Sequence, residues 1–170
     1  MAEEVIEADR LEVPLRLLKP IRLDKVGRAK GFLWPLRKNL PPTLIIDWDG
    51  AQYALYLGGP HPMGFFPIKP DISMRGLLIE DAEFIVDVAS KYDAVQTLDP
   101  RGAIVLRDGE ASICGIALGE AFSDPVMVSL WGDYNIGTKD EAIGFTRWTL
   151  IVRDGDDTIT LWKHDSGEAK

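Results

Sequence analysis

Two strings of clustered carboxylates are the places where this sequence comes closest to chemistry. Asp47-Trp-Asp-Gly50 follows an apolar run, and Asp154-Gly-Asp-Asp157 follows an alternating one. Hard cations prefer clustered carboxylates, so both strings are candidates for a metal site. A calcium loop beginning at Asp154 would need glycine at its sixth position and glutamate at its twelfth, where the chain has Ile159 and Asp165. We therefore interpret the second string as a solvated turn.

The first string, from Leu44 to Gly50, resembles the first motif of haloacid-dehalogenase-type phosphohydrolases, an apolar strand that ends in Asp-x-Asp-Gly. The resemblance implies that Asp47 attacks phosphorus, that Asp49 handles the leaving-group proton and that magnesium is held between carboxylates. It covers only these seven residues, and Ala51 stands where the family usually has threonine. The family's fold also implies a doubly wound parallel sheet, with a helix soon after the motif.

The residues after the motif favour a β-hairpin instead. Asp-Gly is a strong signal for a two-residue turn, and the register that it sets pairs apolar residues on one face: Trp48 with Ala51, Ile46 with Tyr53 and Leu44 with Leu55. We expect the opposite face to be wet, because it carries Thr43, Asp47, Gln52 and Tyr56, with Ile45 and Ala54 among them. Asp47 would then lie on the wet face and Asp49 in the turn, away from any shared metal. A magnesium-dependent phosphohydrolase using Asp47 and Asp49 is accordingly the less favoured alternative, and we expect no catalytic residue, metal or cofactor.

The same pattern, two strand-like runs separated by an Asp-Gly step, recurs along the chain and indicates the fold class. Asp108-Gly109 separates two short apolar runs within 103–115, the stretch 145–162 contains an alternating strand and an Asp-Gly step, and 126–131 reads as a further strand. We predict a single all-β domain over residues 1–170, with antiparallel hairpins that form a β-sandwich or a barrel. Residues 80–95 also fit a helical period, so a β-rich α+β fold with one helix there is the alternative.

Charge is distributed unevenly along the chain. Residues 16–38 contain eight basic residues and one acidic residue, a balance of +7, so a net charge of -8 leaves -15 for the remainder. We predict that residues 1–40 form a partly extended basic segment whose charges recur at every third position: Arg16, Lys19, Arg22, Lys25 and Arg28. This segment either meets an acidic surface on a second copy or on an acidic protein partner, or forms an edge strand whose leucines join the core while its charges face acids. The acidic remainder argues against nucleic acid and anionic membranes.

Three further residues are candidates for ligand or partner binding. Trp34 follows the basic segment, His61 lies between two prolines in a glycine-rich loop, and Phe65 continues that loop. Loops carried on a rigid sheet often bind ligands, and the five tryptophans offer aromatic walls for a small-molecule pocket. A stiff connection whose aromatic residues cap the core is the structural alternative.

These observations predict a function class rather than a reaction. The single cysteine, Cys114, cannot form an intramolecular disulfide, and we expect no membrane span or export signal, which suits a cytoplasmic protein. We expect a non-catalytic binding or assembly module, with a homo-oligomer or an acidic protein as its partner. A small-molecule-binding β-barrel is the alternative.

Overall fold

The computed structural model describes residues 11–23, 30–48, 51–68, 74–94, 99–107, 110–118, 125–130 and 142–167. These residues form strands and two short 3-10 turns, and no α-helix occurs among them. The elements are η2 Leu15–Leu17, β1 Lys19–Leu23, β2 Gly31–Pro35, β3 Thr43–Trp48, β4 Ala51–Tyr56, β5 Gly64–Pro67, β6 Met74–Ile79, β7 Glu83–Val86, η3 Val88–Ser90, β8 Lys91–Asp93, β9 Ile104–Arg107, β10 Glu110–Ala117, β11 Pro125–Ser129, β12 Ala142–Phe145, β13 Arg147–Asp154 and β14 Asp157–Asp165. The predicted all-β class is confirmed.

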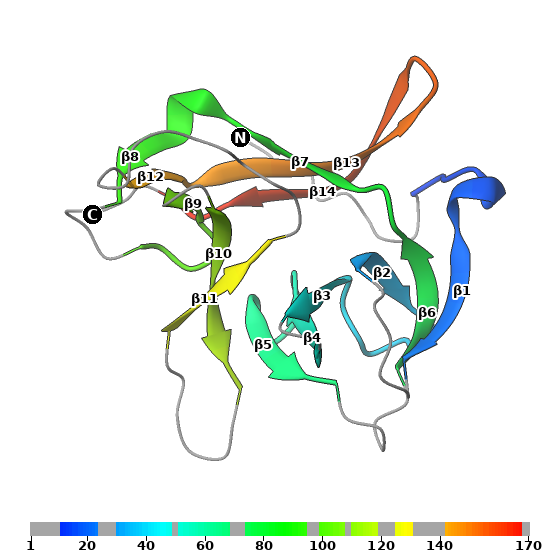
Figure 1. The fold of residues 1–170 in the computed structure, drawn as a ribbon. Coiled ribbons are helices and arrows are strands. Elements are labelled where there is room, and N and C mark those ends of the chain that lie inside the picture. The colour runs from blue at the N-terminus through cyan, green and yellow to red at the C-terminus, as the bar shows by residue number, and fades with distance from the viewer. Residues whose placement is uncertain are drawn as a thin grey trace.

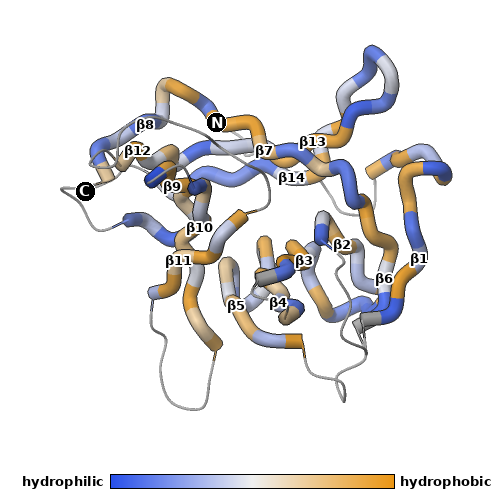
Figure 2. The backbone as a smooth tube through the Cα atoms, in the orientation of Figure 1, coloured by the Kyte–Doolittle hydropathy of each residue, from blue (hydrophilic) through white to orange (hydrophobic). Residues whose placement is uncertain are grey.

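The strands form two sheets (Figure 1). Sheet A has the order β1-β6-β2-β3-β4-β5-β10-β9-β12-β8, with β11 added to β10, and sheet B has the order β14-β13-β7. Every pairing is antiparallel except the short contact of β5 with β10, where Ile116 pairs with Gly64 and Ala117 with Phe65. Sheet B lies across one side of sheet A, and a common apolar core joins residues of both, as in a sandwich (Figure 2). Hydrophilic residues form the projecting end of the β13–β14 hairpin (Figure 2).

The helix considered for residues 80–95 is wrong. Phe84 and Leu150 are cross-strand partners in sheet B, as are Val86 and Trp148. Phe84 and Val86 therefore pack on the core, whereas Ile85 between them is 42% exposed. The chain then turns through η3, where the Asp87 carboxylate accepts a hydrogen bond of 2.9 Å from the Ala89 amide. Because β7 pairs with β13, this segment adopts the strand, in which side chains alternate every two residues, and not the helix.

The β3–β4 hairpin has the register that its Asp-Gly turn predicts, with Trp48 opposite Ala51, Ile46 opposite Tyr53 and Leu44 opposite Leu55. The expectation of a wet opposite face is wrong. Thr43, Ile45, Gln52 and Ala54 on that face are all buried. Ile45 and Ala54 form a second small core with Leu33 of β2 and Leu78 of β6. Neighbouring strands thus supply the cover, and Asp47 stays exposed at the rim.

Residues 99–103 tie the two sheets together. The indole N–H of Trp148 in sheet B donates a hydrogen bond of 2.7 Å to the carbonyl of Gly102, and the Gly102 amide donates one of 2.7 Å to the Cys114 carbonyl in sheet A. His164 stacks on Trp148 with ring centroids 5.0 Å apart. Gly102 has φ +84°, and a Cβ there would lie 2.2 Å from His164 Nε2, so the position requires glycine. This connection holds sheet B over the core.

We predict that Trp148→Phe lowers the free energy of unfolding by about 2–4 kcal/mol, because it leaves the buried Gly102 carbonyl without its donor and removes core volume. Trp162→Phe is the matched control, since the buried indole N–H of Trp162 makes no hydrogen bond to any described residue. Urea unfolding of both variants measures the difference. Equal losses would show that the hydrogen bond to Gly102 contributes nothing.

Candidate functional site

A cavity of about 180 Å³ lies between the N-terminal residues and one end of sheet A. Its floor comes from β2 and β6, and its roof comes from residues 11–18, which we call the strap. The lining residues are all apolar or aromatic: Leu11, Val13, Leu18, Phe32, Trp34, Leu77 and Ile79. We call this cavity the strap pocket.

Strand alternation builds the floor. Phe32 of β2 pairs with Ile79 of β6, and Trp34 pairs with Leu77, so all of these side chains point to the same face. The ring centroids of Phe32 and Trp34 lie 6.0 Å apart. Leu33 between them is buried in the second core on the opposite face. The pairing of β2 with β6 and the burial of Leu33 on the opposite face therefore both fix the floor in place.

The strap is held by its side chains. Among the described residues its backbone hydrogen bonds are internal, from the Leu17 amide to the Pro14 carbonyl and from the Leu18 amide to the Leu15 carbonyl. Leu11, Val13, Leu17 and Leu18 pack against the main core, whereas Leu15 is 84% exposed.

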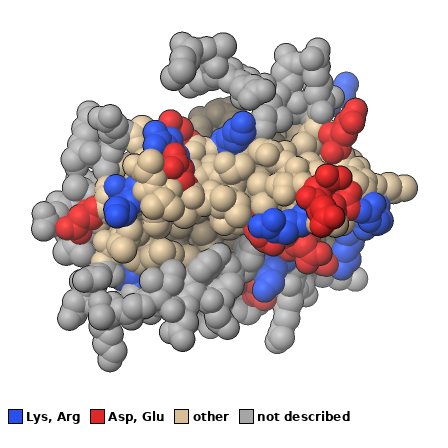
Figure 3. Space-filling model, turned by 90° about the horizontal axis from the view of Figure 1, so that it is seen from above, with Lys and Arg blue, Asp and Glu red and all other residues tan. Residues whose placement is uncertain are grey.

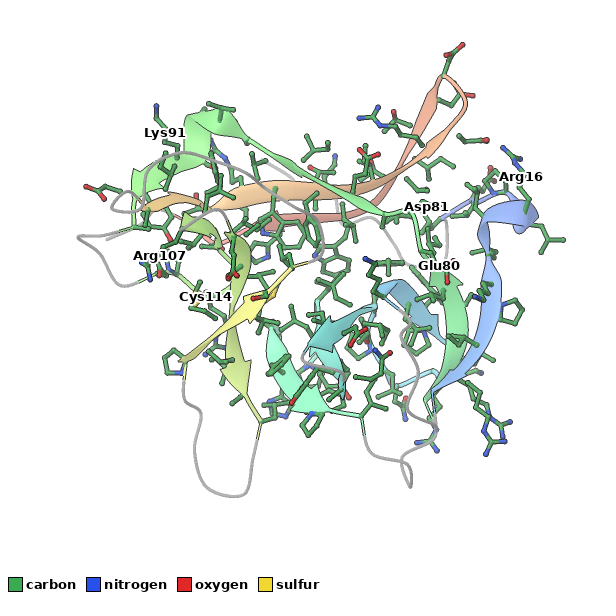
Figure 4. All side chains as sticks on the ribbon, viewed as in Figure 1. Arg16, Glu80, Asp81, Lys91, Arg107 and Cys114 are labelled. Atoms are coloured by element: carbon green, nitrogen blue, oxygen red, sulfur yellow. The ribbon has the colours of Figure 1, made fainter. Side chains whose placement is uncertain are left out.

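Two ion pairs flank the strap. Arg16 pairs with Asp154 at the end of the β13–β14 hairpin, and Lys19 pairs with Glu80 at 3.1 Å (Figure 4). Acidic and basic side chains mingle at this end of the molecule (Figure 3).

The structure separates the predicted basic residues. Arg16 and Lys19 flank the strap and meet acids of their own chain, and Arg22 lies on β1, which pairs with β6 at the edge of sheet A. Lys25 and Arg28 lie outside the described residues. This is the edge-strand arrangement that the sequence offered as the alternative to an exposed arm.

The other predicted site residues do not converge. Trp34 lines the strap pocket, whereas His61 lies exposed in the β4–β5 connection. Phe65 is buried and stacks on Tyr53, with ring centroids 4.9 Å apart, so it belongs to the core.

Asp47 does not stand at the start of a strand-to-helix crossover. The next element is β4, which returns antiparallel to β3, so the parallel fold implied by the phosphohydrolase resemblance is wrong. Asp49 lies outside the described residues. Among the described residues no group of three or more His, Cys, Asp or Glu side chains is placed to hold a metal ion.

The strap pocket was not predicted from the sequence as a unit. The alternation of Phe32 with Trp34 and of Leu77 with Ile79 was a readable signal for one apolar face. The signal for Leu11 and Val13 was too weak, because an irregular segment carries no period that tells which surface it covers.

Comparison with known proteins places the chain in a family. A family model described as "Uncharacterised protein y4lG" matches residues 24–170. The chain belongs to this y4lG family. It is also 30% identical over 146 residues to the "Uncharacterized protein y4lG" of Sinorhizobium fredii (strain NBRC 101917 / NGR234), a match that covers 82% of this chain and 89% of that protein. No solved structure matches the chain.

The family match covers one wall of the strap pocket and not the other. The pocket floor lies within the matched residues 24–170, whereas the strap precedes them. Neither the family's name nor the relative's name states an activity. No helix in the described parts of this y4lG-family chain has the length and apolar character needed to cross a membrane.

A second cluster of titratable groups lies at the other end of sheet A. The Tyr92 hydroxyl donates to the Asp99 carboxylate at 2.7 Å, and the Cys114 thiol contacts the Asp99 carbonyl at 3.7 Å. Burial and the Asp99 hydrogen bond raise the pKa of Tyr92. Burial raises the pKa of Cys114, and the charge of Asp99 raises it further. The Tyr92 hydroxyl and the Cys114 thiol therefore stay protonated at neutral pH, and the thiol has the character of a buried structural residue.

His164 joins this end of the y4lG-family chain to its C-terminal residues. The Nε2 atom of His164 lies 2.6 Å from the Ser166 hydroxyl, which donates at 2.8 Å to the Arg101 carbonyl. Burial lowers the pKa of His164, and the Arg101 backbone and the Asp165 charge offset only part of that effect. The folded chain therefore resists protonation of this ring.

We predict that the free energy of unfolding falls as the pH drops below 6.5, the ordinary pKa of histidine, because the unfolded chain takes up a proton that folded His164 resists. One such proton changes the free energy by at most about 1.4 kcal/mol per pH unit. Urea unfolding between pH 5 and 7 measures the slope, which His164→Gln should flatten. His61→Gln, at an exposed position, should leave the slope as it is. An unchanged slope in His164→Gln would contradict the prediction.

Proposed function

We propose that the protein is a non-catalytic binding protein that takes a small apolar group into the strap pocket. The observation that supports the proposal is the lining, in which every side chain is aliphatic or aromatic. An enclosed apolar cavity of about 150 Å³ is known to bind benzene. The strap pocket has a similar volume, about 180 Å³, and is partly open to solvent.

The size of the pocket limits what it holds. Drug-sized ligands occupy cavities of about 300–1,000 Å³, so this one suits a single aromatic ring or a short branched alkyl group. Burying about 100–150 Å² of apolar surface at about 25 cal/mol per Å² contributes about 3–4 kcal/mol. An isolated group of that kind should bind with a Kd near the millimolar range.

The strap provides a route into the pocket. Its described backbone hydrogen bonds lie within residues 14–18, so the roof can lift without breaking a sheet ladder. The Arg16–Asp154 pair is at the surface and contributes little to holding it down. Ligand entry therefore needs side-chain displacement and no unfolding of either sheet.

An assembly role through the basic residues stays a prediction. Arg16 and Lys19 are engaged with Asp154 and Glu80 of the same chain, so a homo-oligomer or an acidic partner that used them would have to replace these pairs. The strap pocket makes no such demand, and for that reason we rank ligand binding first.

We predict that toluene binds the full-length protein and that Val13→Trp abolishes the binding, because an indole at the roof fills the strap pocket. Saturation-transfer NMR with toluene titrated into the millimolar range measures it. Circular dichroism verifies that the variant is folded.

Leu15→Trp is the matched control, since it adds the same group to the same segment at an exposed position outside the lining. It should bind toluene as the parent protein does. Toluene binding that survives Val13→Trp, or that is absent from the parent, would remove the strap pocket as the binding site.

A further inference from the structure

We infer that the outer face of sheet B, the side turned away from sheet A, binds the same face of a second copy of this chain. The face is formed by β7 and β13 and shares no residue with the strap pocket, so the inference goes beyond the proposed function. Viewed from this side, charged side chains gather toward the two ends of the molecule, and uncharged residues lie between them (Figure 3).

Strand alternation determines which side chains form the outer face. Phe84 and Val86 of β7 pack on the core, as do Trp148 and Leu150 of β13, so the residues between them point outward. The outer face therefore carries Glu83 and Ile85 from β7, Asp87 directly after it, and Arg147, Thr149, the buried Ile151 and Arg153 from β13.

The charges on this face form one acidic row and one basic row. At one end Asp87 pairs with Arg147 at 3.0 Å, and at the other end Glu83 pairs with Arg153 at 3.2 Å. The β7 side of each pair is the acid, and the β13 side is the base. All four side chains are about half exposed, so their charges are available to a second molecule.

Exposed apolar side chains accompany the two rows. Ile85 lies between the two acids and is 42% exposed, and Val88, which follows Asp87 in η3, is 67% exposed. They are two of the four large apolar side chains that are exposed in the described part of the chain. Covering them adds a hydrophobic contribution to an electrostatic contact.

A two-fold axis makes this face complementary to itself. If the axis runs parallel to the strands between β7 and β13, the acidic row of each copy lies over the basic row of the other. Asp87 then faces Arg147 of the second copy, Glu83 faces its Arg153, and Ile85 faces its Thr149. Isologous dimers of this kind are the commonest homo-oligomers, and charge complementarity selects the partner. A second copy is therefore the occupant that the two rows fit.

The internal ion pairs stay intact in such a dimer. Both are made through the arginine Nε atom. A guanidinium group has five N–H donors, so it can bond a carboxylate of the second copy while it keeps its own. The contact adds ion pairs and replaces none.

The area of the face determines the strength of the dimer. The stretch from Arg147 to Arg153 is about 20 Å long and three strands are about 15 Å wide, so each copy contributes about 300 Å². The total of about 600 Å² is below the roughly 1,200 Å² of stable interfaces, which predicts a weak, reversible dimer with a Kd on the order of 100 μM.

A pair of charge variants tests the inference. Arg147→Glu with Arg153→Glu makes both rows acidic, and Glu83→Arg with Asp87→Arg makes both rows basic. Each variant alone should dimerise at least about tenfold more weakly than the parent, because like charges then face each other across the axis. An equimolar mixture of the two should form a heterodimer. Sedimentation velocity of the full-length proteins from about 10 μM to about 1 mM measures the association, since this range brackets the expected Kd.

Ile85→Asp is a second test, since it keeps all four charged side chains and places a charge in the centre of the contact. It should abolish the dimer. Leu36→Asp is the matched control, because it makes the same kind of change at an exposed apolar residue that lies after β2, outside the outer face of sheet B. It should dimerise as the parent protein does. Circular dichroism verifies that each variant is folded.

The outcomes are decisive in either direction. A parent protein that stays monomeric at the highest concentration would overturn the inference, and so would a dimer that persists in both charge variants and in Ile85→Asp. Asp87 also caps η3, so the basic variant is the one most exposed to misfolding. In that case the comparison of Ile85→Asp with Leu36→Asp decides. Val13→Trp, which fills the strap pocket, should dimerise normally, so this inference and the proposed function stand or fall separately.

Discussion

The hydrogen bond from Trp148 to the Gly102 carbonyl is the interaction on which the arrangement of the two sheets depends. In the described residues sheet B has three strands, and its apolar face is buried only where it packs on sheet A. Trp148 places its ring in the common core and its N–H on a loop that is itself bonded to β10. One side chain thus supplies apolar area to the core and fixes where sheet B sits. The β13–β14 hairpin that meets Arg16 projects from the sheet so positioned.

Local signals in the sequence were enough to predict the all-β fold class and the register of the β3–β4 hairpin. The Asp-Gly step and the alternation around it predict the β3–β4 pairing residue by residue, because a two-residue turn leaves one register available. The burial of Gln52 and Thr43 could not be predicted in that way. Ile45 and Ala54 on the same face pack with Leu33 of β2 and Leu78 of β6, and the sequence of one hairpin carries no information about which strands will cover it.

The candidate site was likewise predicted only in part from the sequence. Trp34 was among the predicted site residues, whereas the apolar face that it shares with Phe32, Leu77 and Ile79 was found only in the structure. The strap was expected to be an extended basic segment, and its apolar residues matter more to the site than its charges do. Arg16 and Lys19 find acids on β13 and after β6, and such long-range pairs leave no trace in sequence spacing. His61 and Phe65 show the opposite case, in which a suggestive loop separates into a solvated residue and a core residue.

The two walls of the pocket are attached to the rest of the protein in different ways. The floor belongs to the ladder of sheet A, so a change there disturbs the second core on its other side. The roof is anchored by side chains alone in its described contacts, and it lies upstream of the residues shared with the y4lG family. A substitution in the strap therefore alters one wall of the pocket without touching the hydrogen bonds between β2 and β6.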